Sequence, residues 1–109
     1  MTLKAQAWEK FSKWVQRRDK KCVCCGSIHR LCGGHFYHGV LDFDEENINA
    51  QCNQCNTYKS GNLAVYSNYL LNKLGTKKFK ALNLRHYQAM KAEIRTAEDY
   101  KAIIKRYEN

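Results

Sequence analysis

The chain has 109 residues, a net charge of +9, six cysteines and no proline. This length allows one compact domain, and 44% hydrophobic residues are enough to build a core, which excludes a disordered tail. The excess of 19 Lys and Arg over 10 Asp and Glu favours a polyanionic partner such as nucleic acid. No stretch approaches the roughly 18 apolar residues of a membrane span, and the charged N-terminal segment lacks the apolar core of a signal peptide. We therefore expect an intracellular protein without membrane contact.

Apolar residues at helical spacing predict an amphipathic helix over residues 2–18. The stripe consists of Leu3, Ala7, Trp8, Phe11, Trp14 and Val15. We expect these side chains to form core, with a base-stacking platform as the alternative. Residues 19–34 lack this periodicity and carry cysteines and glycines, which predicts a metal-binding knuckle followed by a short strand.

Residues 35–51 contain an acidic segment that we interpret as a solvated loop, or else as a group that attracts metal. Its acids are Asp42, Asp44, Glu45 and Glu46. Helical spacing resumes after Cys52, and an apolar stripe over residues 63–74 ends at Gly75, a plausible helix stop. Its members are Leu63, Tyr66, Leu70 and Leu74.

Three further helical segments are predicted toward the C-terminus. Thr76 is placed to cap a short basic helix, and residues 86–95 have the character of another helical piece. Thr96 and Asp99 have the spacing of a capping box before a last helix. Because no repeat or flexible linker is present, we expect one domain over residues 1–109. It divides into a basic helix (1–21), a central core (22–62) and C-terminal helices (63–109).

Four of the cysteines form two pairs, Cys22-x-x-Cys25 and Cys52-x-x-Cys55. Two chelating pairs at this spacing are typical of tetrahedral zinc, and a reducing compartment disfavours disulfides. We therefore predict a structural zinc ion, with redox-active thiols or an iron–sulfur centre as alternatives. Four thiolates leave no open coordination position, so such a zinc ion would do no chemistry. The remaining cysteines are expected to be free thiols: Cys24 and Cys32.

Basic residues are concentrated in two arms on either side of the cysteines. Residues 1–21 contain seven Lys and Arg against two acids, and residues 76–91 contain five against none. This clustering predicts a phosphate-binding footprint. The candidate contacts are Lys20, Lys21, Lys77, Lys78 and Lys80.

The residues around the cysteine pairs resemble those of HNH nucleases. His35 follows the predicted strand, Asn47 lies just upstream of the second cysteine pair, and Asn56 directly follows that pair, with Lys59 after it. The sequence is similar in particular to the NinG/Rap family of lambdoid phage recombination nucleases. The segments that carry this resemblance are Cys22–Gly26, Gly34–His35, Glu46–Ile48, Gln51–Asn56, Lys59–Leu63 and Thr96–Tyr107.

The resemblance implies an α+β fold with a zinc-stapled ββα-metal core and flanking helices. It also implies a phage- or prophage-encoded endonuclease that works in the bacterial cytoplasm. Its reaction would be metal-dependent hydrolysis of phosphodiester bonds in branched DNA such as Holliday junctions. Matched cuts on two strands favour a homodimer. The candidate interfaces are the aromatic stripe of residues 2–18 and the apolar face of residues 63–74.

The resemblance further assigns roles to single residues. His35 would act as general base, and Asn47 would orient it. Asn56 would supply an oxygen ligand to a catalytic Mg²⁺ or Mn²⁺ ion, and Lys59 would contact a phosphate. Many HNH nucleases carry Asp before the base, where this chain has Gly34.

The ion would therefore need a further ligand, for which Asp42, Asp44 and His38 are candidates. His38 is also a candidate for substrate contact. Two functions without catalysis compete with the nuclease: a zinc-knuckle module that binds nucleic acid, and a zinc domain that binds protein. Binding needs the charge and the zinc site, whereas a nuclease also needs the His and Asn residues.

Overall fold

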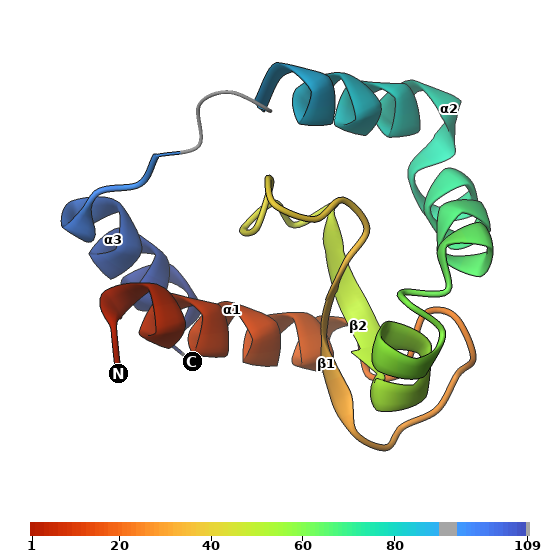
Figure 1. The fold of residues 1–109 in the computed structure, drawn as a ribbon, viewed down its shortest axis with the longest axis horizontal. Helices are drawn as coiled ribbons and strands as arrows, with labels where there is room; N and C mark the ends of the chain where they lie inside the picture. The colour runs from red at the N-terminus through yellow and green to blue at the C-terminus, as the bar shows by residue number, and fades with distance from the viewer. Residues whose placement is uncertain (90–93, 109) are drawn as a thin grey trace.

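The computed structural model describes residues 1–89 and 94–108, in which helices surround a two-stranded hairpin (Figure 1). In chain order the elements are α1 (Leu3–Asp19), β1 (Leu31–His35), β2 (Ile48–Cys52), the single π-helical turn η1 (Gln54–Tyr58), α2 (Leu63–Ala89) and α3 (Ala97–Tyr107). Over the described part of the chain, no helix combines the length and apolar character needed to cross a bilayer.

Helix α1 confirms the prediction for residues 2–18 to within one residue. Thr2 caps its start, because the Thr2 side chain accepts a hydrogen bond from the backbone N–H of Ala5. Lys20 ends it in a left-handed conformation and donates its backbone N–H to the carbonyl of Gln16. The chain then turns into the cysteine knuckle.

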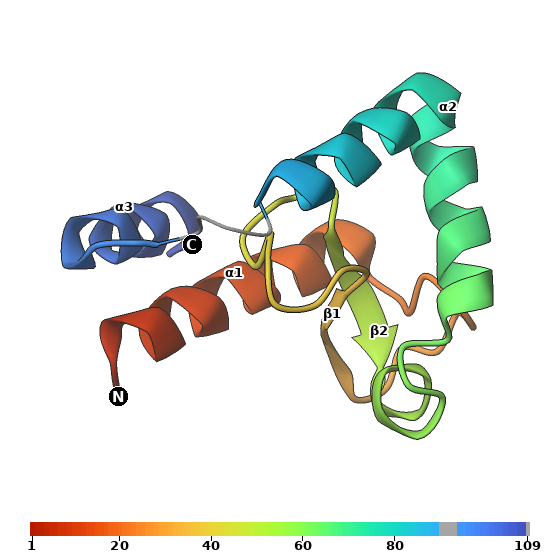
Figure 2. The ribbon, with the colours of Figure 1, turned by 45° about the horizontal axis from the view of Figure 1, so that its top comes forward.

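The two strands pair antiparallel, with Leu31 opposite Cys52 and His35 opposite Ile48. Cys52 and His35 therefore lie at opposite ends of the hairpin. A two-stranded hairpin is marginally stable in water, so its faces need cover. Helix α1 packs on the face that carries Ile48 and Ala50, and α2 begins beside the other face (Figure 2).

The aromatic stripe of α1 is core, as predicted. Phe11 and Val15 are fully buried and cluster with Ile48, Ala50 and Tyr107. The ring of Phe11 meets that of Tyr107 edge-on, with centroids 4.9 Å apart. Since α3 covers this stripe, it offers no free dimer interface.

The capping box predicted before α3 is present. The Thr96 side chain accepts from the Asp99 backbone N–H, and the Asp99 carboxylate accepts from the Thr96 backbone N–H.

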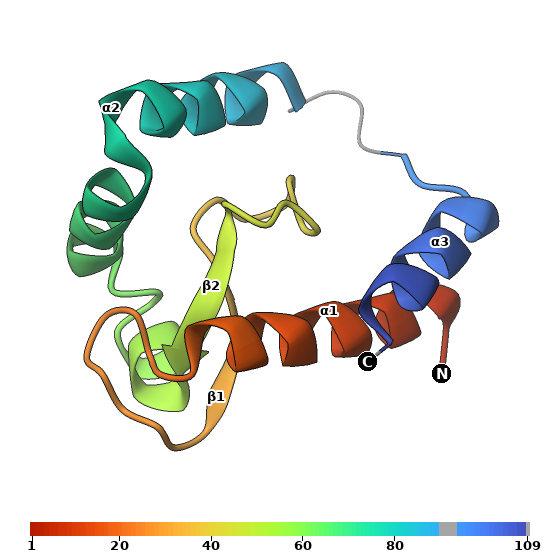
Figure 3. The ribbon, with the colours of Figure 1, turned by 180° about the vertical axis from the view of Figure 1, so that it is seen from behind.

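Helix α2 is broken at Gly75, as predicted, and its halves run in different directions (Figures 1 and 3). Gly75 has φ 80° and ψ 166°, a conformation that residues with a side chain rarely adopt. Tyr66 and Leu70 of the first half are fully buried, as is Leu82 of the second half. The apolar face of residues 63–74 is therefore core at Tyr66 and Leu70, whereas Leu63 is 49% exposed, and its use as a dimer interface stays a prediction.

The helical piece predicted over residues 86–95 is confirmed only in part. Residues 86–89 form the end of α2, whereas residues 94 and 95 are not helical. Residues 90–93 lie outside the described part of the chain.

The acidic segment is a loop, as predicted, but its acids are partly buried and paired instead of solvated. Arg85 of α2 donates to Asp44 at 2.9 and 3.2 Å and to Glu46 at 2.8 Å. Glu45 accepts a hydrogen bond from the Tyr107 hydroxyl of α3 at 2.5 Å. The acids therefore hold α2 and α3 to the loop, through partners too distant in sequence for local patterning to reveal.

A buried hydroxyl joins α2 to the hairpin. Tyr66 is fully buried, and its hydroxyl donates to the carbonyl of Gly34 at 2.7 Å and accepts from the Asn49 amide at 3.1 Å. We expect Tyr66→Phe to lower the free energy of unfolding by about 1–3 kcal/mol, because it removes two buried hydrogen bonds between α2 and the hairpin. Urea denaturation followed by circular dichroism measures the change.

Tyr87→Phe is the matched control, because the Tyr87 side chain is 76% exposed. It should change the stability by less than about 0.5 kcal/mol. Equal stabilities for the two variants would contradict the role given to the Tyr66 hydroxyl.

Candidate metal centre and active site

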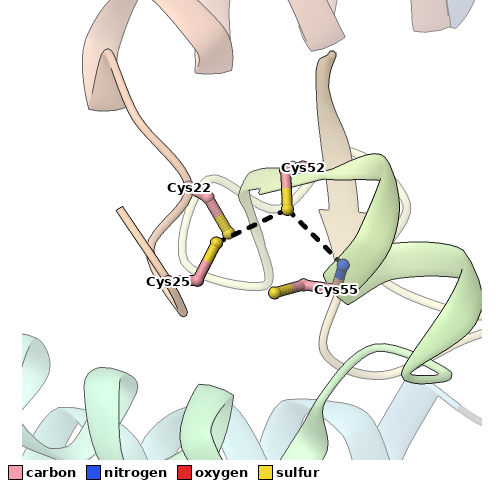
Figure 4. Close-up of side chains that lie close together, drawn as sticks. All are labelled: Cys22, Cys25, Cys52 and Cys55. Atoms are coloured by element: carbon pink, nitrogen blue, oxygen red, sulfur yellow. Dashed lines mark hydrogen bonds between the residues drawn. The ribbon is translucent and has the colours of Figure 1, made fainter. Parts of the chain in front are cut away.

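The structure brings the four paired cysteines together at one end of the hairpin (Figure 4). Cys22 and Cys25 come from the loop after α1, Cys52 ends β2 and Cys55 lies in η1. Their sulfur atoms all lie within 4.8 Å of one another, and those of Cys25 and Cys52 are 3.5 Å apart. Tetrahedral zinc with Zn–S bonds of about 2.3 Å places its sulfurs about 3.8 Å apart. The donor set and its spacing therefore fit a zinc ion.

The four thiols lie in different environments. Burial raises the pKa of the Cys22 thiol, but hydrogen bonds from nearby backbone N–H groups, that of Cys52 foremost, outweigh burial and lower this pKa to about 7. Burial raises the pKa of Cys55 to about 12. A metal ion binds thiolates, so metal binding at this cluster must release protons.

The remaining cysteines lie outside this group of four. The Cys24 sulfur accepts a hydrogen bond from the Gln51 amide at 3.4 Å, and the Cys32 thiol donates to the carbonyl of Gln51 at 3.4 Å. Both are free thiols, as predicted.

His35 lies at the other end of the hairpin, in a hollow of about 250 Å³. Its Nε2 is 3.3 Å from a carboxylate oxygen of Asp42. Its ring stacks on Trp8 at a centroid distance of 4.9 Å and on His38 at 5.3 Å. The hollow is lined by Lys4, Trp8, His35, Asp42 and Phe43.

The surroundings of His35 act on its pKa in opposite directions. Burial lowers the pKa of His35 and is the largest influence, Asp42 raises it, and His38 lowers it. The net result is a pKa below the usual value of 6.5, which leaves the imidazole neutral at neutral pH. A neutral imidazole can accept a proton.

Asn47 fixes the loop that follows His35. It is fully buried, accepts from the backbone N–H of Tyr37 at 2.8 Å, and donates to the carbonyls of Tyr37 at 3.0 Å and Leu41 at 3.1 Å. Asn47 thus holds the backbone of the loop, whereas the polar group that contacts the His35 ring nitrogen is the Asp42 carboxylate.

Gly34 leaves room for Gln51. A Cβ atom at position 34 would overlap the Gln51 side chain, which is fully buried across the hairpin. The amide of Gln51 donates to the carbonyl of Gly61 at 2.7 Å, and its oxygen has no hydrogen-bond partner in the described structure. The Asp that many HNH nucleases carry before the base therefore does not fit this hairpin.

The structure does not bring Asn56 to His35. Asn56 follows Cys55 within η1, at the cysteine end of the hairpin. Within the described residues, no hydrogen bond, ion pair or ring contact joins it to His35, His38 or Asp42. Only the four cysteines form a group of three or more Cys, His or acidic side chains placed to hold one metal ion, among the residues described.

The predicted phosphate contacts are all exposed, and none forms an ion pair with a described residue. They are Lys20, Lys21, Lys59, Lys77, Lys78 and Lys80. Figures 1 and 3 place α1 and the second half of α2 on opposite sides of the hairpin and its loop. The loop that follows His35 therefore lies between the two basic arms.

Lys4 and Trp8 line the hollow although neither was a candidate for the site. Trp8 belongs to the predicted core stripe, and its ring serves both the core and the hollow, because Phe11 meets it at 6.2 Å and His35 stacks on it. The helical pattern alone cannot separate these two uses. A loop that returns to α1 brings Asp42 to this site, and no short motif encodes such a return.

Comparison with known proteins identifies the family of this chain. The sequence model described as "Bacteriophage Lambda NinG protein" matches residues 2–109. The chain belongs to the NinG family. Protein ninG of Salmonella phage P22 is 32% identical over 111 residues, which cover 94% of this chain and 53% of the phage protein. Protein ninG of Escherichia phage 933W is 33% identical over 89 residues, which cover 74% of this chain and 44% of that protein.

Protein ninG of Escherichia phage lambda is 30% identical over 89 residues, with the same shares of the two chains, 74% and 44%. This NinG-family chain thus spans about half the length of the curated relatives that it matches. No solved structure matches it. The small α+β fold with its hairpin and helices is as predicted, and its membership of the HNH superfamily stays a prediction.

We expect the purified protein to contain one zinc ion per chain, measured by atomic emission spectroscopy. Cys52→Ser should lose the zinc and unfold the domain, because the metal joins the loop before β1 to the end of β2 and to η1. The matched control is Cys32→Ser, which leaves the four ligands intact and should keep the zinc. A native circular dichroism spectrum after complete chelation would contradict a structural site.

Proposed function

We propose that this chain is a metal-dependent endonuclease that hydrolyses phosphodiester bonds in branched DNA such as Holliday junctions. The observation that carries this proposal is the contact of His35 with Asp42 in a hollow beside the loop between the two basic arms. Its NinG family membership and its resemblance to HNH nucleases support the same assignment.

In this proposal His35 is the general base. Asp42 accepts from its Nε2 and so holds the ring and its tautomer, which leaves Nδ1 to take a proton from the attacking water. Trp8 stacks on one face of the ring. The hydrogen bonds of Asn47 to Tyr37 and Leu41 fix the loop that places Asp42 beside His35. Asn47 therefore acts on His35 through the loop backbone.

An Mg²⁺ or Mn²⁺ ion would supply Lewis-acid stabilisation of the phosphate when bound. Such an ion is often held by one or two carboxylates together with substrate phosphates and water, so Asp42 suits it as a protein ligand. His38 lies beside His35 as a second candidate. The position of Asn56 in η1 does not favour it as a ligand at the His35 hollow.

The exposed lysines of both arms would hold the DNA backbone through phosphate contacts. A branched substrate offers duplex arms in several directions, which suits basic surfaces on opposite sides of the His35 loop. Paired cuts at a junction need two active sites related by a two-fold axis, and we therefore propose a homodimer.

The His35 role is tested with a labelled four-way junction, with Mg²⁺ or Mn²⁺ and with protein in excess, so that affinity does not limit the rate. We expect wild-type protein to cut the junction and His35→Ala to cut it at least about 100-fold more slowly. Tyr87→Ala is the control, because Tyr87 is 76% exposed on the second half of α2 and lines neither the His35 hollow nor the cysteine end of the hairpin.

Binding without cleavage by the wild type, in either ion, would contradict the enzyme and favour a zinc module that only binds nucleic acid. Unchanged cleavage by His35→Ala would contradict the base.

The Asp42 role is tested by Asp42→Asn, which keeps the size of the side chain but removes its charge. We expect the single-turnover rate to fall about tenfold or more, because the imidazole loses the carboxylate that orients it. Glu98→Gln, an exposed acid on α3, should leave the rate unchanged. A rate for Asp42→Asn equal to that of the control would remove Asp42 from the mechanism.

A further inference from the structure

A second hollow, of about 480 Å³, lies beside the cysteine cluster and outside the His35 site. It is lined by Cys25, Ser27, His29, Arg30, Cys52, Asn53, Gln54 and Tyr58. Ligand pockets in proteins have volumes of about 300–1,000 Å³, so this hollow is large enough for a single nucleotide. No acidic side chain is among its lining residues.

The backbone around this hollow is fixed on both sides. The Asn53 backbone N–H donates to the carbonyl of Arg30 at 3.0 Å, which joins the loop before β1 to the turn after β2. The Thr57 hydroxyl of η1 donates to the side chain of Asn53, the residue before η1, at 3.1 Å. Two cysteines of the cluster, Cys25 and Cys52, form part of the wall. The walls are therefore held in place by the fold.

The side chains of the hollow offer the chemistry that an unstacked nucleotide needs. Tyr58 is an aromatic side chain that is 78% exposed, so its ring is free to stack. Arg30 and His29 are exposed, and neither forms an ion pair with a described residue. Gln54 and Asn53 add amide groups that can bond to the edge of a base.

We propose that this hollow binds one unpaired nucleotide of single-stranded DNA. The base stacks on Tyr58, and the guanidinium of Arg30 contacts its phosphate. A duplex does not enter, because its bases are already stacked and paired.

The inference deepens the proposed function by naming the feature of branched DNA that this end of the hairpin recognises. Leu31 pairs with Cys52 and His35 with Ile48, so the hollow lies four residue pairs from His35. At about 3.3 Å per residue, this separation is about 13 Å. A nucleotide freed at a branch point would be held here while His35 faces a phosphate elsewhere on the strand.

The experiment measures binding by fluorescence anisotropy without added divalent cation, so that its outcome does not depend on cleavage. The probes are a labelled oligothymidylate of about ten nucleotides and a blunt duplex of the same length. We expect Tyr58→Ala to weaken binding of the single strand by about 5- to 100-fold and Tyr58→Phe to restore it. Duplex binding should change less than about twofold.

Tyr87→Ala is the matched control, because Tyr87 is 76% exposed but lies in the second half of α2, outside the hollow. Arg30→Ala provides an independent variant. It should reduce the slope of the logarithm of single-strand affinity against the logarithm of salt concentration by about 0.7. Zinc content and circular dichroism verify that each variant is folded.

Single-strand binding by Tyr58→Ala equal to that of the wild type, or equal to that of Tyr87→Ala, would overturn the inference. An equal loss for the duplex would overturn it as well. Loss of cleavage in His35→Ala, together with single-strand binding that depends on Tyr58, would support both proposals. Single-strand binding that depends on Tyr58, without cleavage by the wild type, would support this inference alone.

Discussion

Strand β2 constrains the rest of the structure, because its two faces carry opposite chemistry and both are buried. Ile48 and Ala50 face α1 and form the apolar cluster, whereas Asn49 and Gln51 face the start of α2 and are fully buried as well. Buried amides must be hydrogen-bonded. Asn49 bonds to Tyr66 and Arg18, and Gln51 bonds to Gly61. The buried amides thus join the start of α2 to β2, whereas α1 combines apolar packing against β2 with the hydrogen bond of Arg18.

The acidic loop holds the three helices together through hydrogen bonds and ion pairs. Asp44 and Glu46 bind Arg85 of α2, and Glu45 binds the hydroxyl of Tyr107 in α3. Arg18 of α1 donates to the carbonyl of Glu45. All three helices therefore meet the loop that brings Asp42 to His35. The ion pairs are partly exposed, so each contributes little alone, and their effect is to fix one arrangement of the loop.

The sequence was informative wherever the signal is local. Helical spacing predicts α1, the Thr96 and Asp99 pair predicts the start of α3, and Gly75 predicts the break in α2. The spacing of the cysteine pairs predicts their meeting. The buried amides of β2 were not predicted, because Asn and Gln are mostly exposed residues and their partners lie on other elements.

Of the candidate site, the sequence predicted the central residues but not the contacts around them. The resemblance singles out His35 and Asn47, and the structure gives each a defined environment. The partner of the His35 ring was only one of several acids that the sequence offered. The packing of Trp8 against His35, and the space that Gln51 takes beside Gly34, depend on contacts between separate elements. A linear motif carries no record of such contacts.

The break at Gly75 separates Lys77, Lys78 and Lys80 of α2 from the first half of the same helix. The second half is held elsewhere, because His86 stacks on Tyr37 at 3.8 Å and Arg85 binds the acidic loop. The second half of α2, with Lys77, Lys78 and Lys80, is therefore positioned by its contacts with the loop that follows His35 and not by the cysteine cluster. If these lysines bind a phosphate, as proposed, its distance from the imidazole is set by the contacts of Arg85 and His86 with the loop.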